Sequence, residues 1–103
     1  MQNTDSTVST ENTVTIRYCV DCRWLLRAQW YAGELLQTFG DALGGVTLVP
    51  SHGAIFRIEV DEQTLWNRKT DGGFPEIGDL KRRVRDLVAP QMSLGHTDRA
   101  VED

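Results

Sequence analysis

The stretch of residues 15–31, TIRYCVDCRWLLRAQWY, decides the fold, because it passes from a strand pattern into a helix pattern. Up to the first cysteine, apolar and polar residues alternate, which is typical of a strand with one buried face. From Arg23 onward, apolar residues recur every three or four positions, as on one face of an amphipathic helix. This stripe comprises Leu25, Ala28, Ala32, Leu36, Phe39 and Leu43. The sequence therefore predicts a strand that ends at Cys19 and a helix that Cys22 enters.

The rest of the chain predicts further strands and a second helix. The Gly44-Gly45 pair is expected to end the first helix. Strand patterns occupy residues 46–50, 54–60 and 63–69, and the gap between the last two is short enough for a tight hairpin. Pro75 suits the first position of a helix that runs up to Pro90. The order β-α-β-β-β-α predicts a mixed four-stranded sheet, with its first two strands parallel and both helices on one face.

Length and charge indicate one small domain with polar ends. A chain of 103 residues forms one core, which removes only about 60–65% of the unfolded surface from water. The net charge of −4 comes from the ends, because residues 13–89 contain ten basic and ten acidic side chains. Since the ends are polar and poor in aromatic residues, we expect disordered tails at residues 1–12 and 90–103.

Composition argues against several classes of function. The balanced charge of the domain provides no field that would attract nucleic acid or an anionic membrane. The basic run KRRVR lies between Asp79 and Asp86, as on a solvated helix face. No apolar stretch has the length of a membrane span or the form of a signal peptide. The expected location is therefore the cytoplasm.

The two cysteines, separated by two residues, admit three chemistries. A structural disulfide across so short a loop removes only about 2 kcal/mol of unfolded-chain entropy, and a reducing cytoplasm disfavours it. A zinc ion needs four ligands, and the further candidates His52 and His96 match no zinc-finger spacing. A dimer sharing four thiolates would be another metal site. The junction of strand and helix favours the third chemistry, a redox-active dithiol with no metal and no cofactor.

Neighbouring groups are expected to tune this dithiol. Free N–H groups and the positive end of the helix dipole favour a thiolate at Cys19, while Cys22 lies close enough to attack a mixed disulfide. Arg23 and Arg27 add positive charge within about one helical turn, and Asp21 opposes them. This reasoning predicts that Cys19 has the lower pKa of the two thiols.

Three segments carry a resemblance to a known family. They read VTIRYCVDCRW, GAIFRIEVDEQTLWNRK and GGFPEIGDLKRRVRD, within residues 13–87. Together they resemble the selenoprotein W group of the Rdx family, in its cysteine-containing bacterial form. The resemblance implies a thioredoxin-like α/β two-layer sandwich and a role in cell redox homeostasis. It also points to Cys22 as the reactive residue, because selenoproteins of this group carry selenocysteine at that position.

The sequence thus predicts a thiol–disulfide oxidoreductase that uses Cys19 and Cys22. The expected partner is a client protein or a low-molecular-weight thiol such as glutathione, and the oligomeric state stays open. The alternative function is a redox-regulated interaction module without turnover, in which oxidation of the pair changes the affinity for a partner protein.

A surface for the client is the least specific part of this prediction. The candidate contacts are Trp24, His52, Gly53, Phe74 and Pro75. The alternatives for these residues are core packing, an ordinary loop position or packing at the start of a helix. Trp24 is expected to be partly exposed because it lies off the helical stripe. Core packing is the expectation for the other tryptophans, Trp30 and Trp66.

Overall fold

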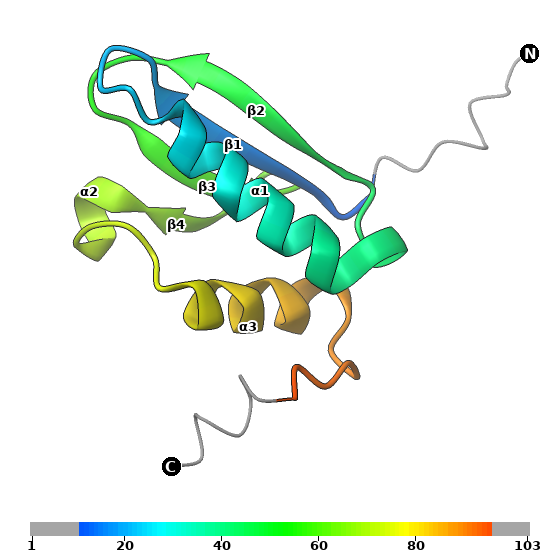
Figure 1. Ribbon diagram of the computed structural model, residues 1–103. Coiled ribbons are helices and arrows are strands. Elements are labelled where there is room, and N and C mark those ends of the chain that lie inside the picture. The colour runs from blue at the N-terminus through cyan, green and yellow to red at the C-terminus, as the bar shows by residue number, and fades with distance from the viewer. Residues whose placement is uncertain (1–10, 96–103) are drawn as a thin grey trace, which may run out of the picture.

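The computed structural model describes residues 11–95, which form a four-stranded sheet with helices packed on it (Figure 1). The strands are β1 (Thr13–Cys19), β2 (Gly45–Ser51), β3 (Phe56–Val60) and β4 (Gln63–Asn67). The helices are α1 (Leu25–Phe39), α2 (Arg68–Asp71) and α3 (Ile77–Val88), with a 3₁₀ turn, η2 (Gly40–Ala42), after α1. The predicted order of strands and long helices is confirmed. The strand predicted over residues 63–69 ends at Asn67, because the chain turns into the short helix α2 there.

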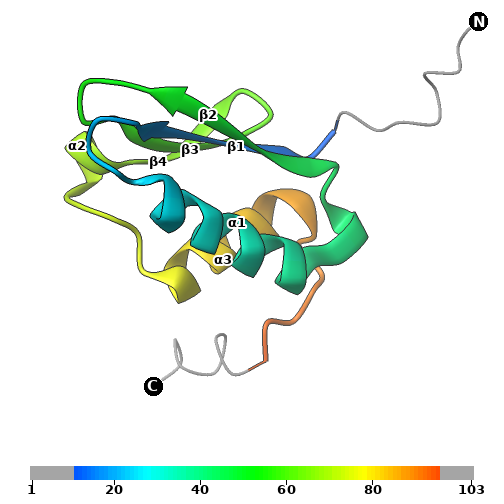
Figure 2. The same cartoon turned by 45° about the horizontal axis from the view of Figure 1, so that its top comes forward.

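The sheet is mixed, as predicted. Its strand order is β2-β1-β3-β4, with β1 parallel to β2 and antiparallel to β3. The helices α1 and α3 lie on the same face of the sheet and contact each other (Figures 1 and 2). This two-layer α/β arrangement is the expected thioredoxin-like one, and it places the end of β1 beside the start of α1.

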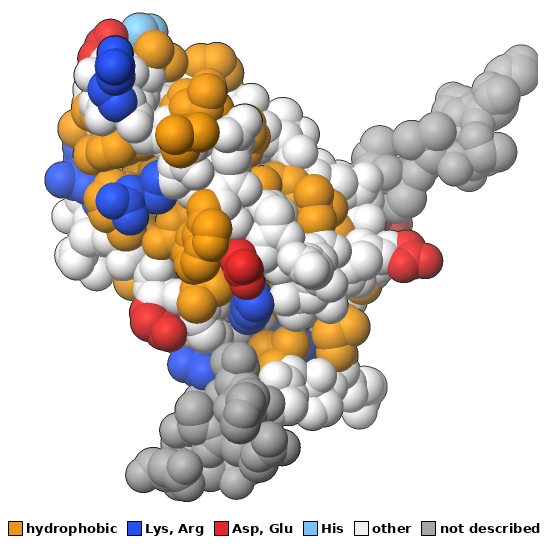
Figure 3. All heavy atoms as spheres, viewed as in Figure 1, with side chains coloured by type: hydrophobic (Ala, Val, Ile, Leu, Met, Phe, Trp, Pro, Cys, Tyr) orange, Lys and Arg blue, Asp and Glu red, His pale blue; other side chains and the backbone are white. Residues whose placement is uncertain are grey.

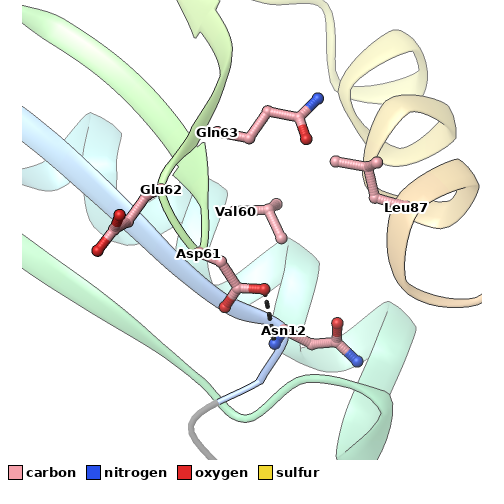
Figure 4. Close-up of a pocket in the computed structure, with 6 residues that line it drawn as sticks. All are labelled: Asn12, Val60, Asp61, Glu62, Gln63 and Leu87. Atoms are coloured by element: carbon pink, nitrogen blue, oxygen red, sulfur yellow. Dashed lines mark hydrogen bonds between the residues drawn. The ribbon is translucent and has the colours of Figure 1, made fainter.

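The turn between β3 and β4 lies at the opposite end of β1 from Cys19. Asp61 takes the left-handed conformation that glycine usually supplies in such turns, with a φ of 55°. Its carboxylate accepts the N–H groups of Asn12 at 3.2 Å and Thr13 at 3.1 Å. Figure 4 shows Asp61 turned toward Asn12 beside a hollow at this turn. These bonds hold the start of β1 in the sheet.

The helix α1 covers the sheet with a stripe that differs partly from the predicted one. Its buried residues are Ala28, Tyr31, Ala32, Leu35 and Phe39. The predicted Leu25 and Leu36 are instead 41% and 44% exposed. The buried stripe is rotated because the large side chains of Tyr31 and Leu35 fill the space over the sheet, where the Tyr31 ring lies 5.7 Å from that of Phe56.

The ends of α1 also differ from the prediction. The helix starts at Leu25 because Arg23 has a φ of 65°, a left-handed conformation that no α-helix continues. It stops at Phe39 because Gly40 takes a φ of 56° and its N–H bonds the carbonyl of Leu36. The Gly44-Gly45 pair does not end this helix.

The helix α3 begins later than predicted. Glu76 is the N-cap, and its side chain accepts the N–H of Asp79 at 2.9 Å. Pro75 therefore precedes the cap and does not occupy the first helical position.

The chain stays in contact with the core beyond the predicted end of the domain. Met92 and Leu94 pack against the core cluster, and the Arg85 guanidinium donates to the carbonyl of Met92 at 3.1 Å. These residues therefore belong to the packed structure rather than to a tail. Asn12 of the predicted N-terminal tail is also held in place, because its side-chain amide donates to the carbonyl of Ala42 at 3.2 Å. Residues 1–10 and 96–103 of the predicted tails lie outside the described residues.

The face of the sheet opposite the helices carries a charge cluster around one buried carboxylate. Glu59 is 8% exposed, and its carboxylate accepts Nε–H groups from Arg17 at 3.1 Å and Arg57 at 2.8 Å. Burial by itself raises the pKa of Glu59, but the hydrogen bonds from the two guanidinium groups outweigh it and lower the pKa below its ordinary value. The ionised carboxylate thus stabilises the pairing of β1 and β3.

The substitution Glu59→Gln is expected to lower the free energy of unfolding at neutral pH by about 1–3 kcal/mol, because both guanidinium groups lose their shared carboxylate. Since folding depresses this pKa, the stabilisation is complete above the unfolded-state pKa of about 4.3 and is lost as the pH falls through the folded-state pKa. Urea unfolding at several pH values measures this effect. A wild-type advantage that does not shrink in acid would contradict it.

Candidate active site

The two cysteines lie on the turn that joins β1 to α1 (Figure 1). Cys19 is the last residue of β1, and its sulfur is bonded to that of Cys22 in a disulfide, with the Cα atoms 5.3 Å apart. The N–H of Arg23 donates to the carbonyl of Val20 at 3.0 Å and closes the turn between them. The turn therefore keeps the two sulfur atoms within bonding reach.

The two cysteines differ in their access to solvent. Cys19 is 1% exposed, whereas Cys22 is half-buried. Cys19 is held within the sheet, where it pairs with Ser51 of the parallel strand β2. The next residue, Val20, donates its N–H to the carbonyl of Ser51 at 2.9 Å. A reagent from solution therefore reaches Cys22 more readily than Cys19.

The start of α1 lies farther from Cys19 than the sequence indicated. Cys22 does not enter the helix, because Arg23 and the N-cap residue Trp24 come before Leu25. A helix start leaves its first N–H groups without intrahelical acceptors, and here these groups belong to residues 25–27. The dipole argument therefore gives Cys19 no advantage over Cys22.

The loop after β2 reaches the dithiol turn. Nδ1 of His52 lies 2.9 Å from a carboxylate oxygen of Asp21, the residue between the cysteines. Both side chains are 73% exposed, so the pair adds little stability. Gly53 follows with a φ of 74°, which turns the chain back toward β3. The loop thus places an imidazole beside the turn that carries the disulfide.

Aromatic rings and guanidinium groups pack around the start of α1. The Trp24 and Phe74 ring centroids are 5.0 Å apart, and Phe56 of β3 lies 5.0 Å from Phe74. The guanidinium of Arg27 stacks over Phe74 at 4.0 Å, and that of Arg68 lies 4.9 Å from the Trp24 ring. Such cation–π contacts each contribute about 0.5–2 kcal/mol. The cluster fixes the loop before α3 against the dithiol turn.

The predicted client contacts therefore have different surroundings. His52 and Gly53 are exposed, and Trp24 and Phe74 are half-buried. Pro75 is buried, and its carbonyl accepts the hydroxyl of Tyr31 at 2.5 Å.

This hydroxyl bond lies deep in the packing between α1 and the loop before α3. Burial raises the pKa of Tyr31, although the nearby Arg27 opposes the rise. The tyrosine therefore stays neutral and donates to Pro75. The side chain of Pro75 packs inside the protein and offers no surface to a client.

Comparison with known proteins decides the family. The model of the Rdx family matches residues 13–86, which include the dithiol and every element from β1 to most of α3. The chain belongs to the Rdx family. This membership and the bonded Cys19–Cys22 pair together support a redox role.

Two solved structures resemble this Rdx protein over nearly their whole length. A protein from Bordetella parapertussis is 55% identical, with a TM-score of 0.72, and the match covers 74% of this chain and 96% of that one. A selenoprotein W-related protein from Vibrio cholerae is 43% identical, with a TM-score of 0.74, and the match covers 77% of this chain and 99% of that one. No curated protein matches.

One feature of this Rdx domain was missed from sequence: an exposed apolar surface beside the dithiol. Val20, Leu25, Leu26 and Trp30 are 42%, 41%, 75% and 50% exposed, and we call these four residues the apolar ridge. Figure 3 shows hydrophobic side chains gathered over the start of α1. The expectation that Trp30 packs in the core is wrong. The available signal was Leu26, a large apolar residue that lies off the predicted helical stripe.

Within residues 11–95, no group of three or more His, Cys, Asp or Glu side chains is placed to hold a metal ion. The candidate ligand His96 lies outside the described residues. None of the helices in the described part of the chain has the length and apolar character needed to cross a bilayer.

Proposed function

We propose that this protein is a thiol–disulfide oxidoreductase whose Cys19–Cys22 pair cycles between dithiol and disulfide. The observation that carries the proposal is the bonded pair of sulfurs on a surface turn at the end of β1. Membership of the Rdx family and the likeness to a selenoprotein W-related protein support it. The substrate is a client protein disulfide, or a low-molecular-weight disulfide such as oxidised glutathione.

In this proposal, Cys22 is the attacking residue because it is the more exposed of the two. Its thiolate attacks one sulfur of the substrate disulfide, whose S–S bond breaks, and the second sulfur leaves as a thiolate. Cys22 and the first sulfur then form a mixed disulfide. This role agrees with the selenocysteine position in the selenoprotein W group and reverses the assignment that the helix dipole favoured.

Cys19 completes the reaction from its buried position at the end of β1. Its thiolate attacks the sulfur of Cys22, the mixed disulfide breaks, and the first substrate sulfur leaves as a thiolate. Two electrons have then passed from the protein to the substrate. The two protons lost by the protein thiols are taken up by the product thiolates through water. A thiol reductant returns the protein to its dithiol form by the reverse exchange.

An interaction module without turnover is the second candidate function. The apolar ridge favours it, because Val20 belongs to the dithiol turn and the other three residues lie on the first turns of α1. A change in the turn on oxidation would alter this surface and the affinity for a partner. Turnover separates the two candidates, because a module passes one pair of electrons and stops.

We expect the full-length protein to reduce many equivalents of a model disulfide when dithiothreitol is the recycling reductant. The measurement is the amount of substrate thiol formed per protein, corrected for the direct reaction of dithiothreitol. The matched control is the double variant Cys19→Ser, Cys22→Ser, which should show only the background. One equivalent of disulfide reduced per wild-type protein, followed by no further reaction, would instead support the interaction module.

A further inference from the structure

The apolar ridge adjoins the turn that carries the dithiol. Val20 lies between the two cysteines, and Leu25 and Leu26 open α1 three residues after Cys22. Together with Tyr18 and Arg23, these three residues line a shallow hollow of about 370 Å³. A side chain of leucine or phenylalanine size fits such a hollow. A substrate held at Cys22 therefore meets apolar surface on the α1 side.

The ridge extends along α1 beyond this hollow. Leu26 and Trp30 are four positions apart, so they lie one above the other on the same helix face. They are the most exposed large apolar side chains in residues 11–95, at 75% and 50%. Large apolar groups that are exposed next to a reactive group mark a contact surface.

The same end of the molecule holds guanidinium groups without carboxylate partners. Among residues 11–95, no ion pair within 4.0 Å joins a carboxylate to Arg23, Arg27 or Arg68. Arg23 and Arg27 are exposed, and Arg27 and Arg68 lie over aromatic rings of the cluster around Trp24. Within the described residues, these three guanidinium groups are therefore not held in ion pairs with carboxylates.

Two carboxylates on this surface already have partners. Asp21 faces Nδ1 of His52 at 2.9 Å, and Glu34, one helical turn after Trp30, accepts from Nζ of Lys81 at 2.9 Å. The surface therefore combines an apolar ridge with a basic rim. A second copy of this chain is a poor occupant, because a two-fold contact would place the same guanidinium groups against each other.

We infer that the site takes protein disulfides in which the cysteine that bonds Cys22 is flanked by a large apolar residue and an acidic residue. The apolar residue packs on the ridge, and the acidic residue meets the guanidinium group of Arg23 or Arg27. This inference rests on the proposed function and specifies its substrate class. Glutathione has no large apolar side chain that could pack on the ridge. The ridge therefore also favours protein segments of this kind over glutathione.

The test uses mixed disulfides of short peptides with thionitrobenzoate, a yellow leaving group that reports each attack. One peptide has leucine and aspartate beside its cysteine, the second has leucine and lysine, and the third has glycine and serine. We expect the reduced full-length protein to react about tenfold faster with the first peptide than with the second at low salt. The difference should shrink as salt is added, because the charges are exposed.

Two pairs of variants separate the contribution of the apolar ridge from that of the guanidinium groups in the basic rim. Leu26→Ser should lower the preference for the leucine–aspartate peptide over the glycine–serine peptide about fivefold. Leu36→Ser is the matched control, because this leucine lies on the same helix, is 44% exposed and is ten residues farther from the dithiol. Arg23→Gln should reduce the preference for aspartate over lysine, and Arg23→Lys should retain most of it.

The outcomes distinguish this inference from the proposed function. A symmetrical small disulfide, dithiobis(nitrobenzoate), tests the dithiol alone. If the wild-type protein reacts with it but treats the three peptides alike, the inference is wrong and the oxidoreductase proposal stands. An equal loss of preference in Leu26→Ser and Leu36→Ser would also overturn the inference. If the protein reacts with no disulfide, the proposed function fails and the inference fails with it.

Discussion

Replacing Cys19 with serine is expected to convert the protein into a trap that holds its substrate at Cys22 as a stable mixed disulfide. The reason is that the buried Cys19 supplies the thiolate that attacks the mixed disulfide at Cys22. Without Cys19, this disulfide stays intact and the substrate is not released. Replacing Cys22 with serine should instead abolish capture. The remaining thiol of Cys19 is 1% exposed and reacts only when the turn opens.

Alkylation of the two single-cysteine variants by iodoacetamide measures this difference directly. We expect Cys22 in the Cys19→Ser variant to react on the order of tenfold faster than Cys19 in the Cys22→Ser variant, because local opening costs free energy. Alkylation in urea is the control, since unfolded variants should react at similar rates. A faster reaction at Cys19 in the folded protein would restore the assignment made from the helix dipole.

The substitution Phe56→Ala is expected to cause the largest loss of stability, about 3–5 kcal/mol. Phe56 is 0% exposed, and its ring lies 5.0–6.3 Å from those of Trp24, Tyr31 and Phe74. The smaller side chain leaves a cavity where α1, β3 and the loop before α3 meet. In a domain of this size, such a loss lowers the midpoint of thermal unfolding by roughly 15–30 °C.

Thermal and urea unfolding of the oxidised protein measure this effect. Leu36→Ala is the matched control, because Leu36 is 44% exposed and its truncation should change the free energy of unfolding by about 0.5 kcal/mol or less. A Phe56→Ala protein that unfolds at nearly the wild-type temperature would show that the aromatic cluster around Phe56 does not hold the two layers together.

The strands were predictable because their side chains alternate with period two. β1 ends at Cys19 as predicted, and along it Val14 and Ile16 face the core while the intervening residues do not. The position of the dithiol at the end of this strand followed directly. The parallel pairing of β1 with β2 also followed, because a strand–helix–strand unit leaves few alternatives.

The helix bounds were less predictable because backbone conformation at single residues decided them. Nothing in a pattern of apolar residues indicates that Arg23 takes a left-handed φ of 65°, which delays the start of α1 until after Trp24. The rotation of the buried stripe toward Tyr31 and Leu35 likewise depends on which side chains best fill the space over the sheet. The exposure of Trp30 is a consequence of that rotation.

The surroundings of the dithiol depend on contacts between residues that are distant in sequence. Asp21 and His52 are 31 residues apart, and the stacking of Arg27 on Phe74 joins α1 to the loop before α3. Spacing within one segment cannot reveal such pairs. The sequence therefore indicated the chemistry of the site, while the relative access of Cys19 and Cys22 required the packed structure.

The equilibrium of the full-length protein with glutathione tests the central claim most directly. The protein is incubated in buffers that span a range of ratios of reduced to oxidised glutathione, and the exchange is quenched by alkylation. Mass spectrometry then measures the fractions of reduced and oxidised protein. We expect a single transition between a dithiol and a monomer with a Cys19–Cys22 disulfide. At a fixed concentration of oxidised glutathione, the ratio of oxidised to reduced protein should fall as the square of the reduced glutathione concentration, because two glutathione thiols are consumed per protein disulfide. Disulfide-linked dimers, or a protein that stops at one bound glutathione per chain, would contradict an internal redox couple.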